Sequence, residues 1–96
     1  MSAWLIVDTH VKDAEAYEAY KAGAAPIVAK YDGVYRARGG AMDIRETDLW
    51  APTRMVLIEF PSMDEARGFL DDPDYAEVKP IRHANADSTI FVLEGM

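Results

Sequence analysis

Five side chains in this sequence have the types and spacing needed for chemistry on a small organic anion: Asp8, His10, Arg36, Arg38 and Glu59. An arginine holds a carboxylate or an enolate oxygen through paired hydrogen bonds. A glutamate removed from water has a raised pKa, and a histidine titrates near neutral pH, so either can transfer a proton. The sequence therefore predicts that Arg36 and Arg38 bind the anion and that Glu59 or His10 is catalytic.

The alternation of side chains along the predicted strands places these polar groups beside apolar ones. Glu59 shares a face with Leu57, and Asp8 shares a face with Trp4. If that face lines a cavity, the charged groups lie in largely apolar surroundings. Asp8 then joins the arginines in binding the substrate, and Trp50, in the loop before the strand of Glu59, is the fourth predicted substrate-binding residue.

A structural role explains the same residues without catalysis. Glu59 would pair with Arg38 across adjacent strands, and a buried ion pair of this kind fixes strand register. Perturbed charges also occur in structural pairs, which makes this the simpler interpretation. His83 follows Arg82 at a predicted helix end, where cations are ordinary capping groups. The two histidines lack the spacing of metal ligands, so neither a metal site nor a cofactor is predicted.

Other candidate residues also have structural interpretations. Ser62 precedes Glu65 by three residues, which is typical of a helix capping box rather than of a nucleophile. Gly39 and Gly40 do not form a phosphate-binding loop, because they lack the spacing of its glycines and a following helix. Tyr35 and Trp50 line either a pocket mouth or a dimer seam, and the seam is favoured because aromatic residues are enriched in interface cores.

Composition narrows the class of protein. The 96 residues carry a formal net charge of −7 and no cysteine. A single domain without disulfides or thiolate sites is expected. The acidic balance argues against nucleic acid and anionic membranes as partners. The first residues look like a strand rather than a signal peptide, so a cytoplasmic protein is expected.

Apolar periodicity and breakers predict the elements. Asp13 is the expected cap of the first helix, in which Gly23 and Pro26 predict a kink or break. Asp72 followed by a proline predicts a restarted helix. The expected strands are 3–10, 34–40 with an edge continuation over 41–47, the first half of the stretch 53–66, which Pro61 ends, and 88–93. The expected helices are one after Asp13 with an apolar stripe to Tyr31, one over about 63–70, and one that restarts at Pro73 and is closed by 85–87.

The element order β-α-β-β-α-β is that of the ferredoxin-like α+β fold, with a four-stranded antiparallel sheet and helices on one face. The first and third strands are the most apolar and are expected at the centre. The uncovered sheet face would carry Trp4, Ile6, Met55, Leu57, Phe91 and Leu93. An apolar face of that size indicates an interaction site, and packing two such faces together gives a homodimer, the dimeric α/β barrel.

Several segments resemble one family. They are Tyr-Arg-Ala-Arg-Gly-Gly at 35–40, Trp-Ala-Pro-Thr-Arg at 50–54, Ile-Glu-Phe-Pro-Ser at 58–62, Asp-Pro-Asp-Tyr at 72–75, Arg82 and the closing Glu-Gly at 94–95. Across nearly the whole chain the sequence is similar to the family called domain of unknown function 1330, apart from Tyr-Asp-Gly at 31–33, where two glycines are usual. The resemblance implies the dimeric α/β barrel fold and supplies no activity. Relatives sharing the barrel include cofactor-free monooxygenases, isomerases and dye-bleaching haem peroxidases.

Two hypotheses of function follow. In the first, the protein binds a small organic, anionic molecule between sheet and helices or at the barrel centre, as a cofactor-independent isomerase or monooxygenase. In the second, it is a non-catalytic structural or interaction module in which Arg–Glu pairs fix the dimer.

Overall fold

Four segments of the chain form the strands of one antiparallel sheet. The structure is a computed structural model that describes residues 1–96. In chain order the elements are β1 (Ala3–Val11), α1 (Ala14–Lys30), β2 (Val34–Arg38), β3 (Met55–Phe60), α2 (Met63–Asp71), α3 (Pro73–Asn85) and β4 (Ala86–Glu94). The strands pair antiparallel in the order β2-β3-β1-β4, which confirms the ferredoxin-like α+β fold with the first and third strands at the centre.

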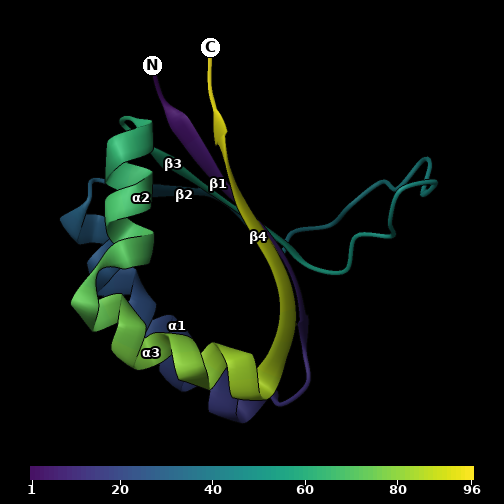
Figure 1. Cartoon of the computed structure of the whole chain (residues 1–96). Coiled ribbons are helices and arrows are strands. Elements are labelled where there is room, and N and C mark those ends of the chain that lie inside the picture. Colours follow the sequence, from purple (N-terminus) through teal and green to yellow (C-terminus); the bar gives the residue numbers. More distant parts are fainter.

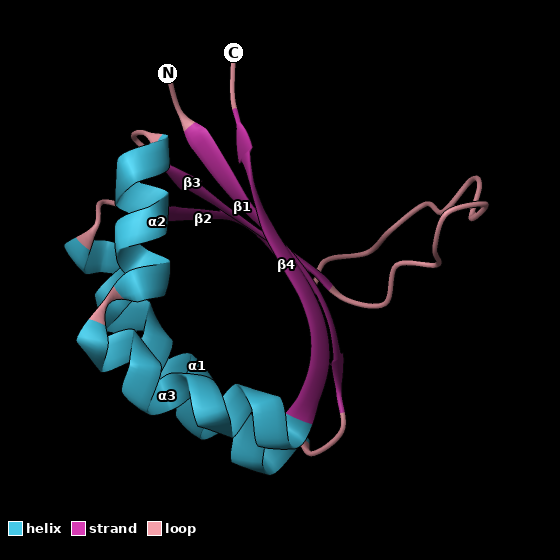
Figure 2. Ribbon diagram, viewed as in Figure 1, coloured by secondary structure: helices cyan, strands magenta, loops and turns pink.

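All three helices cover one face of the sheet, and the other face has no cover (Figure 1; Figure 2). Leu5 of β1 is buried beneath the helices, whereas its neighbour Trp4 is only partly buried. On β4, Phe91 and Leu93 are 41% and 55% exposed. We call the uncovered side the open face, and it carries Trp4, Ile6, Met55, Leu57, Phe91 and Leu93. Within one chain β1 is thus covered on one side only, as the sequence predicts.

The core between sheet and helices is built around aromatic rings. The ring of Phe69 on α2 lies 5.7 Å from that of Phe60 on β3 and 4.6 Å from that of Tyr75 on α3, centroid to centroid. All three side chains are at most 2% exposed. Tilted aromatic pairs of this kind stabilise a fold beyond the area that they bury.

The helix starts are capped by the predicted side chains. Asp13 accepts a hydrogen bond of 3.1 Å from the backbone N–H of Ala16 at the start of α1. Ser62 accepts one of 3.2 Å from the N–H of Asp64, and its hydroxyl donates to Glu65. These bonds satisfy amide groups that have no partner inside the helix, so the interpretation of Ser62 as a cap is confirmed.

The first helix continues where its sequence predicts a kink or break. α1 is one helix from Ala14 to Lys30 with Gly23 and Pro26 inside it, and α3 likewise continues past Pro80, although each proline lacks the N–H for one helical hydrogen bond. Gly23 serves close packing, because a Cβ atom there would lie 2.5 Å from Cγ1 of Val78 on α3. The contact between α1 and α3 therefore offsets the cost of helix-breaking residues.

None of the three helices has both the length and the apolar composition that crossing a membrane requires.

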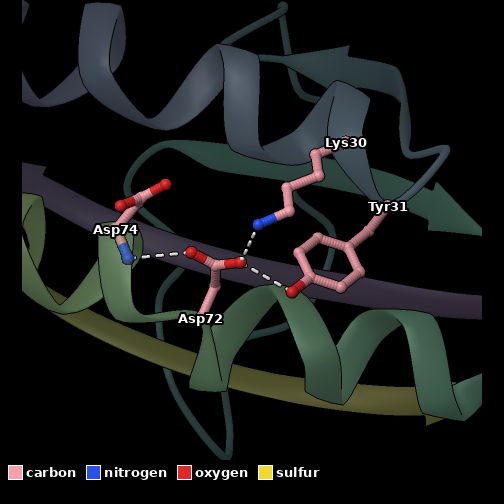
Figure 3. Close-up of polar contacts among 4 residues, drawn as sticks. All are labelled: Lys30, Tyr31, Asp72 and Asp74. Atoms are coloured by element: carbon pink, nitrogen blue, oxygen red, sulfur yellow. Dashed lines mark hydrogen bonds and ion pairs between the residues drawn. The ribbon is translucent and has the colours of Figure 1, made fainter.

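A buried carboxylate joins the end of α1 to the junction of α2 and α3 (Figure 3). The side chain of Asp72 is 1% exposed and accepts hydrogen bonds from Lys30 Nζ at 2.7 Å and from the Tyr31 hydroxyl at 2.6 Å. It also caps α3 by accepting from the N–H of Asp74 at 2.8 Å. The hydrogen bonds from Lys30 and Tyr31 lower the pKa of Asp72 to about 2.

Residues 39–54 form a long connection between β2 and β3, which we call the arm. It projects away from the helices (Figure 1; Figure 2) and contains no strand, so the predicted edge strand over 41–47 is wrong. Met42 and Ile44 alternate as in a strand, but they have no ladder partner and are 40% and 48% exposed. A loop of this length without secondary structure is uncommon in a compact domain and is typical of a functional segment.

The base of the arm is fixed by Asp8 of β1. Its carboxylate accepts hydrogen bonds from Trp50 Nε1 at 2.9 Å, from both the N–H and the hydroxyl of Thr53 at 2.8 Å, and from the N–H of Arg54 at 3.2 Å. Desolvation alone would raise the pKa of Asp8, but the hydrogen bonds from Thr53, Arg54 and Trp50 together outweigh it and lower that pKa. Asp8 therefore holds the arm against the sheet as a carboxylate.

A β-bulge in β2 changes which side of the sheet its residues occupy. Tyr35 pairs with Ile58 of β3, but the next pair is Ala37 with Leu57, so Arg36 is an extra residue. Because side chains alternate, one extra residue moves every later side chain to the opposite face. Strict alternation along 34–40 predicts that Arg36 and Arg38, two residues apart, share a face, and the bulge makes that prediction wrong.

The Asp72 junction predicts a defined pH dependence of stability. An aspartate in the unfolded chain has a pKa of about 3.9, so a folded pKa of about 2 stabilises the native state above pH ~4. This contribution is lost as the pH falls through 2. The variant D72N keeps a capping side chain but loses the charge. In urea unfolding, its deficit in free energy of unfolding should be largest at neutral pH and should close toward pH 2.

The matched control for this prediction is D71N, which removes the adjacent exposed carboxylate. Its stability should follow the wild type across the same pH range. A deficit of D72N that stays constant down to pH 2 would contradict the proposed role of the charge.

Removal of the Asp8 carboxylate should release the arm while the sheet stays folded. Several hydrogen bonds to a charged acceptor are lost in D8A, and together they contribute more than about 1.5 kcal/mol. Trypsin should therefore cleave after Arg45 about tenfold faster or more in D8A. The control is D87N, which alters an exposed carboxylate away from the arm. Equal cleavage rates for D8A and the wild type would show that Asp8 does not hold the arm.

Candidate functional site

A pocket lies between the sheet and the helices, and its lining is chemically simple. Twelve of its fifteen lining residues are hydrophobic, and the other three are Lys21, Arg38 and Arg54. Its cavity volume is about 40 Å³. Since ~10–15 Å³ is enough for one water molecule, the pocket has room for a few waters or a very small ligand. An apolar cavity whose remaining lining residues are all cations is suited to an organic anion.

Three separate segments supply the cations: Lys21 lies on α1, Arg38 ends β2, and Arg54 precedes β3. The bulge in β2 turns Arg38 to the helix side, where it pairs in register with Val56, a core residue. Arg54 stands just before β3, and its carbonyl accepts a hydrogen bond of 3.0 Å from the N–H of Thr9. Gly39 has a φ of 69°, and a Cβ there would lie 2.9 Å from Nε of Arg54. Only glycine readily combines this backbone conformation with so close an approach.

A carboxylate of the protein itself, that of Glu18, lies at the mouth of the pocket, where it competes with a bound anion for the cations. Glu18 borders an adjoining hollow that shares Lys21 and Arg54 with the pocket, and its carboxylate lies 2.8 Å from Nζ of Lys21. The hydrogen bond and charge of Lys21, with smaller effects from Arg38 and Arg54, lower the pKa of Glu18. The carboxylate therefore stays ionised, and a bound anion would have to compete with it.

Tyrosines provide the remaining polar atoms of the pocket. Tyr35 lines it and lies under the Arg38 guanidinium, whose carbon is 4.8 Å from the ring centroid. The hydroxyls of Tyr20 on α1 and Tyr75 on α3 lie 2.9 Å apart. Burial, which outweighs the nearby Arg38 charge in one case and the Arg82 charge in the other, raises the pKa of Tyr35 and of Tyr20. These phenols therefore stay neutral at physiological pH and can donate hydrogen bonds.

Most of the predicted site residues lie elsewhere. Glu59 is on the open-face side of β3 and pairs with Arg36, with Nε 3.0 Å from Oε1, so the predicted pairing of Glu59 with Arg38 is wrong. The bulge is the reason, because it leaves Arg36 on the side of Glu59 and moves Arg38 away. His10 is exposed near the end of β1, opposite Asp87. The catalytic roles assigned to Glu59 and His10 stay predictions.

The predicted substrate-binding residues are likewise separated. Of the four, only Arg38 lines the sheet–helix pocket. Arg36 is in the pair with Glu59, and the carboxylate of Asp8 is occupied by the arm. Trp50 is half-exposed at the base of the arm. Tyr35 lines the pocket, which is the less favoured of the two places predicted for it. His83 is exposed at the end of α3 and lies 3.2 Å from Nη2 of Arg82.

Sequence reasoning missed two of the three cations, although the pattern contains signals for both. Lys21 follows Tyr17 by four residues, and residues at this spacing share a helix face. Arg54 precedes Val56 by two residues and so belongs on its side of the strand. The extra residue at Arg36 has no comparable signal, since neither it nor its neighbours is a glycine. No group of three His, Cys, Asp or Glu side chains in the structure is placed to hold a metal ion.

Comparison with solved structures supports the fold. A protein of unknown function from Rhodopseudomonas palustris has a TM-score of 0.77 and 22% identity, over 99% of this chain and 82% of the other. SnoaB, a cofactor-independent oxygenase from Streptomyces nogalater, has a TM-score of 0.66 and 18% identity, over 99% and 93%. A dimeric ferredoxin-like protein of unknown function from Thermobifida fusca has a TM-score of 0.62 and 15% identity, over 99% and 92%.

At the level of sequence, no curated protein matches this chain. The family described as Domain of unknown function (DUF1330) matches residues 2–96. That match covers the sheet, the helices and the arm, and the chain therefore belongs to the DUF1330 family.

Proposed function

We propose that this protein binds a small organic acid, as its anion, in the pocket between the sheet and the helices. The observation that carries the proposal is the lining itself: every lining residue that is not hydrophobic is a cation, in a protein whose net charge is −7. Lys21, Arg38 and Arg54 bind the anionic group at the mouth. The apolar walls take the rest of the molecule.

The strength of binding depends on where the charges meet. Hydrogen bonds from an ionised donor to an ionised acceptor are roughly twice as strong as neutral ones. The overall negative charge repels anions at a distance, so affinity comes from local contacts and not from long-range steering. Lys21 and Arg38 are long and partly exposed, and their movement can widen a cavity of about 40 Å³ for a ligand larger than a few waters.

The same groups are suited to a reaction that passes through an enolate or phenolate. Cations that contact a developing oxyanion lower the free energy of that state, which favours transfer of a proton from the bound acid to the ionised carboxylate of Glu18 at the border of the pocket. Cofactor-independent oxygenation and isomerisation both begin with such a deprotonation. SnoaB has this fold and is described as a cofactor-independent oxygenase, so we propose this class of chemistry for the pocket.

Two arginines two residues apart in β2 give a matched test. In R38M the binding of small carboxylates such as pentanoate should weaken at least tenfold, because one charged contact at the mouth is lost. In R36M, which alters an arginine on the other side of the sheet, binding should be unchanged. Isothermal titration calorimetry or ligand-observed NMR at low salt measures both. Equal effects of R38M and R36M, or no binding by the wild type, would overturn the proposal.

The carboxylate at the mouth gives a test in the opposite direction. E18Q removes the anion that pairs with Lys21, so pentanoate should bind several-fold more tightly than it does to the wild type. The control is E77Q, which alters an exposed glutamate of α3. Weaker binding in E18Q would show that Glu18 supports the site instead of competing for it.

A second function, self-association, is favoured by the open face. Phe91 and Leu93 are exposed on the open face, and the arm extends on the same side of the sheet (Figure 2). We propose that two copies pack their open faces together as a dimeric α/β barrel. The Arg36–Glu59 pair would then become buried and would fix the register of the interface. Glu59 and His10, if catalytic, would act from this side, at the barrel centre.

Substitutions on the open face should weaken the dimer without unfolding the chain. F91S should raise the dimer dissociation constant at least tenfold, because truncation of a buried aromatic at an interface typically costs more than about 1–2 kcal/mol. E59Q should weaken the dimer as well, since it leaves a buried arginine unpaired. Sedimentation equilibrium measures the constant, with K79S on the outer surface of α3 as the control. A monomeric wild type at high concentration would refute this assembly.

A further inference from the structure

The hydroxyl pair of Tyr20 and Tyr75 has one hydrogen more than it uses. The two oxygens are 2.9 Å apart, so one hydroxyl donates to the other. The hydrogen of the accepting hydroxyl is not used in the folded chain, because neither tyrosine makes a further hydrogen bond. A buried polar hydrogen without a partner carries a free-energy cost that a ligand or a water molecule can relieve.

The charged residues that line the pocket around the pair are all hydrogen-bond donors. Both tyrosines line the sheet–helix pocket, and neither a carboxylate nor a histidine is among its lining residues. Tyr75 is 1% exposed and its ring packs on Phe69. The Arg82 guanidinium lies 6.0 Å from the centroid of the Tyr20 ring, and a guanidinium offers only donors. The free hydrogen is therefore available to a molecule inside the pocket.

The pocket thus has two chemically different ends. Tyr17 lies beside Lys21 and Arg54 in the adjoining hollow, and its ring is 5.1 Å from that of Tyr20, centroid to centroid. The ring of Tyr20 is in turn 6.2 Å from that of Tyr75. A row of rings therefore leads from the cationic mouth to the neutral hydroxyl pair. A ligand held at the mouth by its charge extends along these rings toward a hydrogen-bond donor.

We propose that the natural ligand is an oxo acid, whose carboxylate contacts the mouth and whose carbonyl oxygen accepts a hydrogen bond from the Tyr20–Tyr75 pair. This inference rests on the proposed function, and it adds the second functional group of the ligand. A carbonyl oxygen accepts hydrogen bonds and does not donate them, so it complements a single free hydrogen. A carbonyl group also makes the adjacent C–H bonds acidic, as an enolate-forming reaction requires.

The wild-type protein tests the inference with ligand pairs that differ only in C=O against CH₂. The probes are 2-oxopentanoate and 4-oxopentanoate against pentanoate, and 5-oxohexanoate against hexanoate, with dissociation constants from calorimetry. At least one oxo acid should bind roughly two- to tenfold more tightly than its parent, as expected for one neutral hydrogen bond. If pentanoate binds but no oxo acid is preferred, the inference is wrong while the proposed function stands. If no acid binds, both are wrong.

Tyrosine variants locate the donor. In Y20F/Y75F both hydroxyls are gone, so the preference for the oxo acid should disappear while pentanoate still binds. A single variant keeps one hydroxyl with a free hydrogen, so the preference should be lost only when the removed hydroxyl is the one that reaches the ligand. R38M should weaken both members of a pair equally. A preference that survives in the correctly folded double variant would overturn the assignment.

Discussion

The extra residue in β2 is the constraint on which the candidate site depends. One bulged residue, Arg36, keeps the first half of the strand in one alternation and inverts the second half. Arg38 is thereby moved from the open face to the pocket, and Arg36 is left beside Glu59. Two arginines that look equivalent in sequence thus have different surroundings. A strand without the bulge would leave the pocket with two cations and would place two arginines on the surface proposed for self-association.

The bulge gives the two sides of the sheet different arrangements of charge. On the helix side, the cations Lys21, Arg38 and Arg54 meet a mostly apolar lining with one carboxylate, Glu18, at its border. On the open face, the charges of Arg36 and Glu59 cancel within a pair among apolar side chains. A site that binds an anion needs uncompensated positive charge, whereas a packed interface needs paired charge. The two arrangements of charge can coexist because they lie on opposite faces of the sheet.

Two aspartates tie the surrounding segments to this framework. Asp72 holds the end of α1 against the junction of the other two helices, and Asp8 holds the base of the arm on β1. Each carboxylate accepts several hydrogen bonds. These bonds stabilise the ionised form, and they therefore lower the pKa of Asp72 and of Asp8. The Asp8 contact also bears on the pocket, since Arg54, one of its hydrogen-bond donors, is a pocket cation.

Local signals in the sequence were sufficient for the element order, the caps at Asp13, Ser62 and Asp72, and the apolar open face, because these depend on neighbouring residues and on strict alternation. Two predictions from the sequence were wrong, namely the edge strand at 41–47 and the face of the sheet on which Arg38 lies. Both depend on pairing with β3: the arm has no ladder partner, and the bulge exists only as a mismatch between two strands. Tertiary structure alone brought together Lys21, Arg38 and Arg54, because no local pattern records which distant side chains meet across a core.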